Sequence, residues 1–255
     1  MASLREYGVV AMLGASLTLS DVAGLAQTEA QSPDPWSYQG PRGPEQWTAL
    51  APAFAACGQR EQSPIDLANA VPAQLGALAV DWRQVPLHVV RNGHAVEAEA
   101  SDPGAVNRIT LAGKDYRMVQ FHLHHPSEHR INGRRYPLEV HFVHRSSSGA
   151  LTVVGVLFTE GRANPALDLM IDHARSDDES DRVRIDPRQL LPARRTFFRY
   201  EGSLTTPPCS ETVNWVVLAT PLTASARQIA EVAEVYGDNA CPIQPLGRRF
   251  LLVSQ

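Results

Sequence analysis

The sequence predicts a single domain that is mainly β, with few helices. Seven short runs of β-type residues, separated by turn residues, account for much of the chain. Only two stretches have the apolar spacing of an amphipathic helix. The chain has 255 residues, of which 44% are hydrophobic and 20% are charged. That composition is ordinary for a globular protein, and a sheet-rich domain of this length is often undivided.

Turn residues mark the ends of several expected strands. Asn92-Gly93 between the first two strands is a strong hairpin signal, and Asn132-Gly133 indicates a further turn. The second expected helix has Ser225 as a candidate N-cap. The expected strands are residues 86–91, 94–100, 106–111, 116–124, 138–145, 151–159 and 213–219, and the expected helices are residues 166–174 and 224–236.

Residues 1–26 resemble a secretory signal peptide. They contain an apolar run at residues 9–19, too short for a transmembrane helix, followed by small residues at 24–26. We therefore expect a periplasmic or secreted protein whose mature domain is residues 27–255, with no membrane span. A disordered or buried N-terminus is the alternative interpretation of the same segment.

An irregular arm is expected directly after this leader. Residues 27 to about 50 are rich in Pro, Gln, Ser and Gly, which is typical of a linker. The same stretch also contains Trp36, Tyr38 and Trp47. Because three aromatic side chains favour burial, we expect the arm to pack on the body of the domain.

Charge and cysteine content limit the classes of function. The net charge is −4 and the 23 basic residues are scattered, so the sequence offers no electrostatic surface for nucleic acid. The acidic run at residues 176–181 is interpreted as a solvated loop. The three cysteines allow three possible pairs, and an oxidising compartment permits one disulfide with one thiol left over.

Histidines are concentrated in one part of the chain, since five of the nine lie between residues 122 and 141. In the expected strand at residues 116–124, the side chains of Gln120, His122 and His124 share one face. Two imidazoles at positions i and i+2 of a strand can reach the same metal ion, whereas on a helix they would diverge.

The following strand adds a third histidine. There Glu139, His141 and Val143 share one face. If the two strands pair antiparallel, His141 meets the other two histidines on a common face. Three neutral histidines that leave one tetrahedral position open are typical of a catalytic zinc site.

Polar residues two positions before the ligands strengthen the zinc interpretation. Gln120 precedes His122 and Glu139 precedes His141, so each can accept the second ring N–H of its ligand. The alternative is that all of these are ordinary polar residues on a half-exposed sheet. The remaining histidines have weaker claims: His125 points to the opposite face from His124, and His129 and His144 are expected to be hydrogen-bonded structural residues.

At this point the sequence closely resembles the α-carbonic anhydrases, and in particular their bacterial members. The matching segments occur in the family order and cover nearly all of the mature chain. They are QSPID at 62–66, NGH at 92–94, QFHLH at 120–124, SEH at 127–129, EVHFVH at 139–144, EGSLTTPPCSE at 201–211 and QPL at 244–246. The resemblance implies a large, twisted, mostly antiparallel central sheet with small flanking helices, and cis peptide bonds before Pro64 and Pro208.

The resemblance also implies an activity: reversible hydration of carbon dioxide to bicarbonate and a proton by a carbonate dehydratase, a zinc lyase. The metal ligands would be His122, His124 and His141, and hydroxide bound to Zn²⁺ would attack the substrate. Thr205 would orient that hydroxide and donate its own hydroxyl proton to Glu128.

Further roles follow from the same resemblance. His94 would be the proton shuttle, since the ordinary pKa of histidine lies near 6.5. Thr206 would border the position of substrate and bicarbonate. The apolar wall for carbon dioxide would be formed by Val143, Val153, Leu204 and Trp215, of which the last three also fit plain core packing.

The cysteines match the family only in part. Cys57 and Cys209 correspond to a disulfide that is common in bacterial members. Cys241 stands where we expect arginine, in a loop that supplies a backbone carbonyl to the second zinc histidine, here His124. The substitution therefore puts the position of this loop in doubt, and the spare thiol is a candidate for mispairing or dimer formation.

Two other functions remain as alternatives. A non-catalytic binding domain on the same fold is disfavoured because all three histidines, Glu128 and Thr205 are present. A zinc esterase is disfavoured because the pocket residues suit a small apolar substrate. The expected partner is a small molecule and not nucleic acid, and the protein is expected to be a monomer or homodimer.

Overall fold

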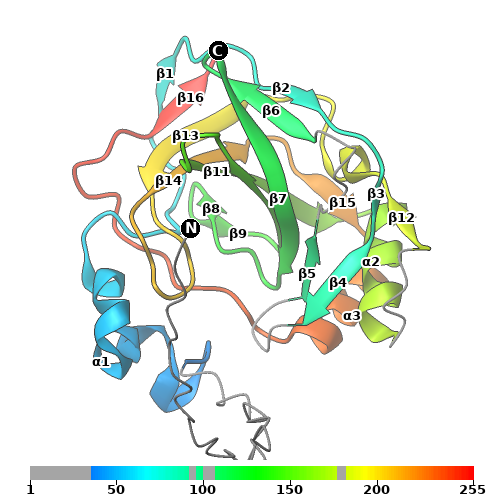
Figure 1. The fold of residues 1–255 in the computed structure, drawn as a ribbon, viewed down its shortest axis with the longest axis horizontal. Coiled ribbons are helices and arrows are strands. Elements are labelled where there is room, and N and C mark those ends of the chain that lie inside the picture. The colour runs from blue at the N-terminus through cyan, green and yellow to red at the C-terminus, as the bar shows by residue number, and fades with distance from the viewer. Residues whose placement is uncertain (1–35, 92–95, 100–106, 177–181) are drawn as a thin grey trace, which may run out of the picture. The chain divides into compact units, whose positions relative to one another are not determined.

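The structure, a computed structural model, describes residues 36–91, 96–99, 107–176 and 182–255. It consists of one large curled sheet with a few short helices on its periphery (Figure 1). The predicted fold class is therefore confirmed. Among the described residues, no helix has the length and apolar character needed to cross a bilayer.

The main sheet has 12 strands, and nine of them follow the order β1-β16-β13-β14-β11-β10-β7-β5-β4. Outside this order, β6 pairs with β7, β2 pairs with β6, and β15 pairs with β11. Most pairs are antiparallel, but β16 with β1 and β11 with both β14 and β15 are parallel. The strands are β1 (Val71–Ala73), β2 (Ala79–Asp81), β4 (His88–Arg91), β5 (Val96–Glu99), β6 (Arg108–Leu111), β7 (Lys114–His124), β10 (Leu138–Arg145), β11 (Leu151–Glu160), β13 (Phe197–Gly202), β14 (Val213–Leu218), β15 (Leu222–Ala224) and β16 (Leu252–Ser254).

Smaller elements complete the fold. Two two-stranded sheets pair β3 with β12 and β8 with β9. Their strands are β3 (Val85–Pro86), β12 (Arg184–Ile185), β8 (Arg130–Ile131) and β9 (Arg134–Arg135). The helices are α1 (Trp47–Leu50), α2 (Pro165–Arg175) and α3 (Ala226–Tyr236), and the 3-10 turns are η1 (Gly40–Arg42), η2 (Pro44–Gln46), η3 (Pro52–Gly58) and η4 (Pro187–Leu190).

All seven predicted strands are present, with boundaries shifted by a few residues. The run at 86–91 is divided between β3 and β4, and the turn at Asn92-Gly93 lies outside the described residues. β4 and β5 on either side of it are antiparallel partners, as a hairpin requires. The sequence did not predict β1, β2, β8, β9, β12, β13, β15 or β16. Most of these have only two or three residues, too few for a period-two pattern to be visible.

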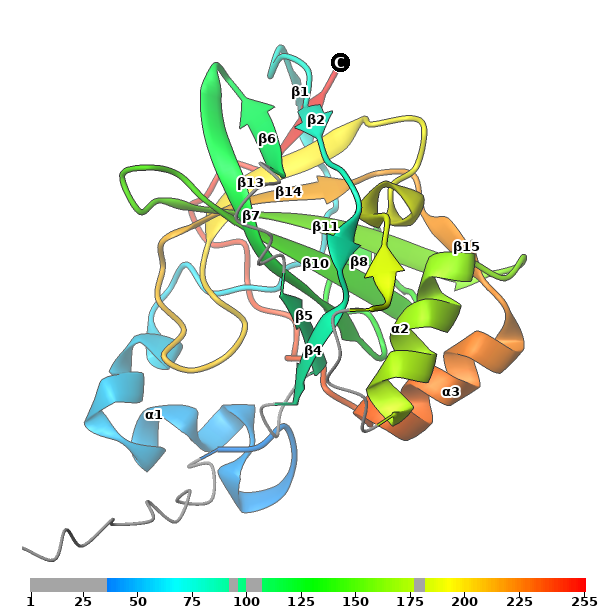
Figure 2. The ribbon, with the colours of Figure 1, turned by 45° about the vertical axis from the view of Figure 1, so that its right-hand side comes forward.

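The main sheet buries one face against helices. Phe121 of β7 and Phe142 of β10 are fully buried, and their rings lie 5.4 Å apart. Leu167 of α2 and Val232 of α3 belong to the same apolar cluster. Both helices therefore cover this side of the sheet, and they lie next to each other (Figure 2). The opposite face carries a second apolar cluster, which includes Val153 and Trp215, and the remaining positions on it are free for polar side chains.

Both predicted helices begin at side-chain caps. Asn164 accepts a hydrogen bond from Ala166 N at 2.9 Å, and Pro165 occupies the first turn of α2. Ser225 caps α3, as predicted, and forms a capping box with Gln228. The Gln228 amide is buried and also bonds both backbone groups of Asn164, which ties the starts of the two helices together.

The aromatic arm packs on the body, as predicted, over the part of it that the structure describes. The Trp36 ring lies 5.3 Å from Tyr38 and 5.2 Å from Trp47, in edge-to-face contacts. These three side chains form one cluster with Cys209 and Cys241.

Cys57 and Cys209 form the disulfide that the resemblance implied, with an S–S distance of 2.02 Å. It joins η3 to the loop after β13 across a separation of 152 residues. Cys241 is free and only 6% exposed. The peptide bonds before Pro64 and Pro208 are cis, as expected, and so is the bond between His125 and Pro126, which the sequence motifs did not indicate.

His144 of β10 is a buried histidine on the helix-covered face. Its ring stacks on Trp82 at 5.6 Å, and its Nδ1 lies 2.9 Å from the Phe142 carbonyl oxygen. Since a carbonyl can only accept, Nδ1 carries the proton in this contact. Burial lowers the pKa of His144 to about 3, so the ring is neutral at ordinary pH.

Replacing His144 is expected to make the free energy of unfolding depend less on pH in the acidic range. The unfolded chain takes up a proton on this ring near pH 6.5, whereas the folded protein does so only near pH 3. Between these values the wild type loses stability as the pH falls, by up to ~1.4 kcal/mol per pH unit. Urea unfolding of His144→Gln at pH 7, 6 and 5 should show a smaller loss than wild type. Parallel slopes would contradict the neutral buried ring.

Removing the disulfide is expected to destabilise the protein strongly. A loop as long as the one that Cys57 and Cys209 close corresponds to roughly 5 kcal/mol in the chain-entropy estimate. The double variant Cys57→Ser, Cys209→Ser should lower the free energy of unfolding by an amount of that order. Thiol titration under denaturing, non-reducing conditions should find one thiol in wild type and none in Cys241→Ser. Three thiols in exported wild-type protein would rule the bridge out.

Candidate metal centre

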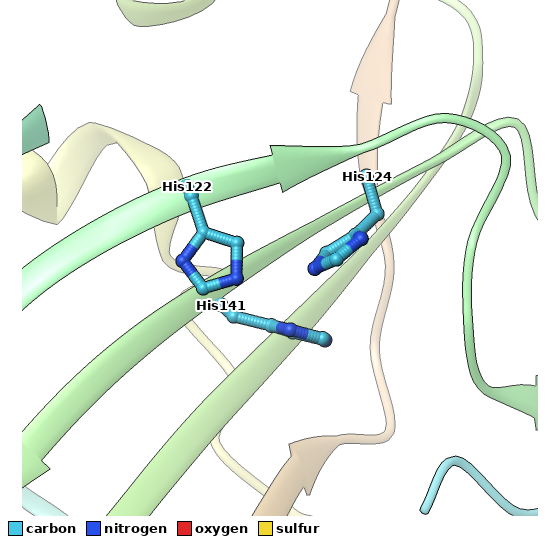
Figure 3. Close-up of side chains that lie close together, drawn as sticks. All are labelled: His122, His124 and His141. Carbon is cyan, nitrogen blue, oxygen red and sulfur yellow. The ribbon is translucent and has the colours of Figure 1, made fainter. Parts of the chain in front are cut away.

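Three histidine rings converge beside β7 and β10 (Figure 3). They lie on the opposite face of the sheet from Phe121 and Phe142. β7 contributes His122 and His124, and β10 pairs antiparallel with β7 so that His141 lies directly opposite His122. One ring nitrogen from each histidine lies within 4.8 Å of the other two. The convergence expected from the strand periodicity is therefore present in the structure.

The residues two positions before the ligands orient two of the rings. Gln120 Oε1 lies 2.8 Å from Nδ1 of His122, and Glu139 Oε1 lies 2.9 Å from Nε2 of His141. Because these oxygens accept, the contacted ring nitrogens carry the protons. Nε2 of His122 and Nδ1 of His141 therefore keep their lone pairs for a metal ion.

Asn239 orients the remaining ring, His124. Its carbonyl oxygen lies 2.8 Å from His124 Nδ1, while its side chain bonds the Leu123 carbonyl oxygen and the His125 amide at the end of β7. The resemblance predicted a backbone carbonyl from this loop. No sequence pattern indicated that the buried Asn239 amide attaches the loop to β7, since the two segments are more than 110 positions apart.

The electrostatics of the three rings suit a metal cation. Burial, followed by repulsion from His124 and His141, holds the pKa of His122 well below its ordinary value. Burial also lowers the pKa of His124 to about 4 and lowers that of His141. Nε2 of His124 is buried and has no hydrogen-bond partner among the described residues. Three neutral imidazoles, one with an unused buried nitrogen, fit zinc with a fourth position open.

Glu139 is the centre of a buried hydrogen-bond network. Its Oε2 accepts from the backbone amides of Glu128 and His129 at 2.9 and 2.8 Å, and its Oε1 contacts His129 Nδ1 at 2.8 Å. Burial alone would raise its pKa, but His129 and His141 together hold the pKa of Glu139 well below the ordinary value. Glu139 is therefore an anion that fixes the His141 ring beside it through a hydrogen bond.

The network extends away from the metal centre. His129 Nε2 lies 2.7 Å from the Tyr200 hydroxyl, which donates to Ser63 Oγ at 3.0 Å. His129 is thus a hydrogen-bonded structural residue, as predicted. Gly155 of β11 makes room for this arrangement, since a Cβ there would lie 2.9 Å from Glu139 Oε1.

Glu128 is buried next to the histidines. Its Oε1 accepts from the Cys241 amide at 2.8 Å, and its Oε2 lies 3.6 Å from His124 Nε2 and 3.8 Å from His141 Nδ1. Burial raises the pKa of Glu128 to about 7, against the opposing effects of His141, the Cys241 amide and the Thr205 side chain. Thr205 is 7% exposed and lies near Glu128, but Oε2 of Glu128 has no hydrogen-bond partner among the described residues, so the bond from Thr205 to Glu128 stays a prediction.

The loop that contains Cys241 keeps its backbone contacts. Asn239 bonds His124 through its carbonyl, and Cys241 bonds Glu128 through its amide. Both contacts use main-chain atoms, which explains why a cysteine at 241 leaves them in place. The thiol itself is buried, and burial raises its pKa well above the ordinary range.

Four apolar residues lie on the metal side of the sheet. Val143, Val153 and Trp215 follow one another across β10, β11 and β14, and they share an apolar cluster with Leu204. Val143 and Leu204 are partly exposed, whereas Val153 and Trp215 are 2% exposed and also fit a core role. The Trp215 ring lies 4.8 Å from the His141 ring.

Three further residues were considered in the sequence analysis: Thr206, His125 and His94. Thr206 is partly buried, directly after Thr205. His125 does not join the cluster: its Nδ1 lies 3.2 Å from the Gly237 carbonyl oxygen in an exposed contact. His94 lies outside the described residues, so the assignment of a proton shuttle to it stays a prediction.

Comparison with known proteins identifies the family. A family model described as eukaryotic-type carbonic anhydrase matches residues 42–250. A carbonic anhydrase of Nostoc sp. is 38% identical over 262 residues, covering 98% of each chain, and one of Pectobacterium carotovorum is 40% identical over 222 residues, covering 85% of this chain and 90% of the relative. The α-carbonic anhydrase of Thermovibrio ammonificans, solved with the inhibitor sulfanilamide, superposes with a TM-score of 0.80 at 40% identity, covering 86% of this chain and 98% of that one. The chain therefore belongs to the α-carbonic anhydrase family.

Removing the Gln120 amide is expected to weaken metal binding. Gln120→Ala leaves the His122 ring without the partner that orients it, and the loss of such contacts typically lowers metal affinity about 10- to 100-fold. Zinc affinity should be measured by competition with a chelator at pH 7. Gln84→Ala, a change of the same type at an exposed position, is the control. Equal affinities for the two variants would show that the contact does not support the ligand.

Proposed function

We propose that this protein hydrates carbon dioxide reversibly, with Zn²⁺ held by His122, His124 and His141. The observation that carries the proposal is the arrangement of the three rings. Each ring uses one nitrogen for an oxygen partner and directs the other toward the same point. Family membership supports the substrate.

Zinc at this site would supply Lewis acidity, which lowers the pKa of bound water so that a nucleophile is available at neutral pH. The protein's own contribution is to keep the ligands neutral and correctly oriented. Burial lowers the pKa of each ring, so protons do not compete with the metal at neutral pH. Glu139 and Gln120 fix the proton on the far nitrogen of their rings.

Thr205 and Glu128 would orient the attacking group. The Thr205 hydroxyl has one proton, and the Glu128 carboxylate beside it can accept that proton in a hydrogen bond. The threonine oxygen is then restricted to accepting from the nucleophile. This arrangement directs a lone pair of the nucleophile toward the substrate and provides the orientation part of catalysis.

An apolar wall would receive the substrate. Val143 and Leu204 present partly exposed apolar surface beside the histidines, with Val153 and Trp215 packed behind them. Carbon dioxide makes no strong hydrogen bonds, so such a wall holds it without competing polar contacts. Thr206 would border the position of the bicarbonate product.

We also propose that His94 exports the proton released in each turnover. Its ordinary pKa near 6.5 allows it to accept and release a proton at physiological pH. Residues 1–26 would direct the protein to the periplasm or the outside of the cell, where the Cys57–Cys209 disulfide is stable.

Two other functions are distinguished by measurement. Dioscorin dioA3 of Dioscorea japonica is 34% identical over 253 residues, so relatives of this chain include proteins with another name. A non-catalytic binding protein would show no hydration of carbon dioxide. A zinc esterase would be more efficient on activated esters than on carbon dioxide.

The decisive experiment is stopped-flow hydration of carbon dioxide together with zinc analysis of the mature protein. We expect one zinc per chain and fast hydration. His122→Ala should remove both, because two imidazoles do not complete the site. His125→Ala, which changes a partly exposed histidine next to the cluster, is the control and should retain both. Zinc-loaded wild type without hydration would contradict the proposed activity.

The shuttle is tested separately. His94→Ala should lower the maximal turnover in weak buffer, because proton export then limits the reaction, while small imidazole buffers should restore part of it. The ratio of turnover to KM should change little. Unchanged turnover in weak buffer would exclude His94 from this role.

A further inference from the structure

A cavity of about 720 Å³ lies next to Glu128, which forms part of its wall. None of His122, His124 and His141 lines it. Its walls come from three separate parts of the chain: the arm at residues 38–46, the β8–β9 hairpin and the segment 238–243. A volume of this size is typical of a site for a small organic molecule. The proposed reaction makes no use of it.

Two arginines of the hairpin line this cavity. Arg130 of β8 and Arg135 of β9 are directly opposite each other in the pairing of the two strands. Arg135 donates from Nε to the Ser127 carbonyl oxygen at 3.1 Å. Among the described residues, neither guanidinium has a carboxylate partner. Like charges in opposite positions of a strand pair are destabilising, so this arrangement favours an anion between them.

Arg130 in particular lacks the contacts that a half-buried arginine needs. Its Nε is buried and has no hydrogen-bond partner in the described parts of the chain. Such a group carries a desolvation penalty unless something else accepts its proton. Arg134, one position along the same hairpin, differs in this respect: its guanidinium lies 4.7 Å from the Tyr136 ring centre and donates to Thr159 Oγ1.

A third unused donor lines the same cavity. The Tyr38 hydroxyl oxygen is buried, and no hydrogen-bond partner for it occurs in the described residues. The acidic lining residues Glu45 and Asp238 are exposed and form ion pairs with neither arginine. The remaining carboxylate, Glu128, accepts from the Cys241 amide through Oε1, while its buried Oε2 has no hydrogen-bond partner among the described residues. The lining thus offers unused donors from Arg130 and Tyr38, together with one buried carboxylate and two exposed ones.

We propose that this cavity binds a small organic molecule through an oxyanion group, a carboxylate or a phosphate, held between Arg130 and Arg135. Guanidinium groups match both kinds of oxyanion with paired hydrogen bonds. Tyr38 supplies a further donor, and Glu45 and Asp238 suit hydroxyl or ammonium groups on the rest of the ligand. The proposal does not depend on hydration activity.

The binding test uses the zinc-loaded protein with its metal saturated by sulfanilamide, so that anions do not bind at the zinc. The probes are inorganic phosphate and succinate, and the readout is the unfolding temperature as a function of probe concentration. We expect saturable stabilisation of wild type by at least one probe. A response to phosphate alone identifies a phosphate ligand, and a response to succinate alone identifies a carboxylate ligand.

Matched variants of the hairpin decide the site. Arg130→Gln should weaken probe binding by about tenfold or more, the loss of a charge-assisted pair of hydrogen bonds. Arg134→Gln removes the same charge from the same hairpin and should bind like wild type. Arg135→Gln is a second variant in case Arg130→Gln does not fold. The proposal would be overturned if the Arg130 and Arg134 variants lost the same amount of affinity for the probe. It would also be overturned if wild type showed no saturable binding.

Discussion

The antiparallel register between β7 and β10 is the constraint on which the rest of the site depends. It pairs His141 with His122 and Phe142 with Phe121, so it aligns the metal face and the core face at the same time. A slip of one residue would exchange the two faces of β10 and move His141 into the apolar cluster. The burial of Phe121 and Phe142 against α2 and α3 therefore holds the histidines together, although neither aromatic ring contacts a metal.

Hydrogen bonding makes the polar face of this sheet compatible with burial. Glu139 and His141 are almost fully buried, and a charged or polar group in that position is costly unless its partners are present. Glu139 satisfies its oxygens with two backbone amides and two imidazoles. The bond to Glu139 fixes the orientation of the His141 ring, and burial keeps that ring neutral by lowering its pKa. The three histidines that could hold a metal ion are thus organised by the protein itself, with a carboxylate kept in the interior.

The segment around Asn239 and Cys241 connects the metal centre to the rest of the molecule. On one side it bonds His124 and Glu128 through main-chain atoms. On the other side it lines the cavity to which Arg130 and Arg135 also contribute. Main-chain contacts tolerate changes of side chain, which is why the departure at Cys241 coexists with an intact ligand network. The same cysteine is part of the cluster formed by the aromatic arm and the disulfide.

The sequence by itself determined the local features of this protein. Period-two patterns placed His122, His124 and His141 on the correct faces of their strands, and Ser225 marked the start of α3, because these properties depend on a few neighbouring residues. Only the tertiary structure decided the features that join distant segments. The attachment of Asn239 to β7, the path from Glu139 to Tyr200 and Ser63, and the pairing of short strands such as β16 have no local signal, since each partner lies far away in the chain. The cavity next to Glu128 also has no local signal in the sequence, because three separate segments form it and none of them encloses a space alone.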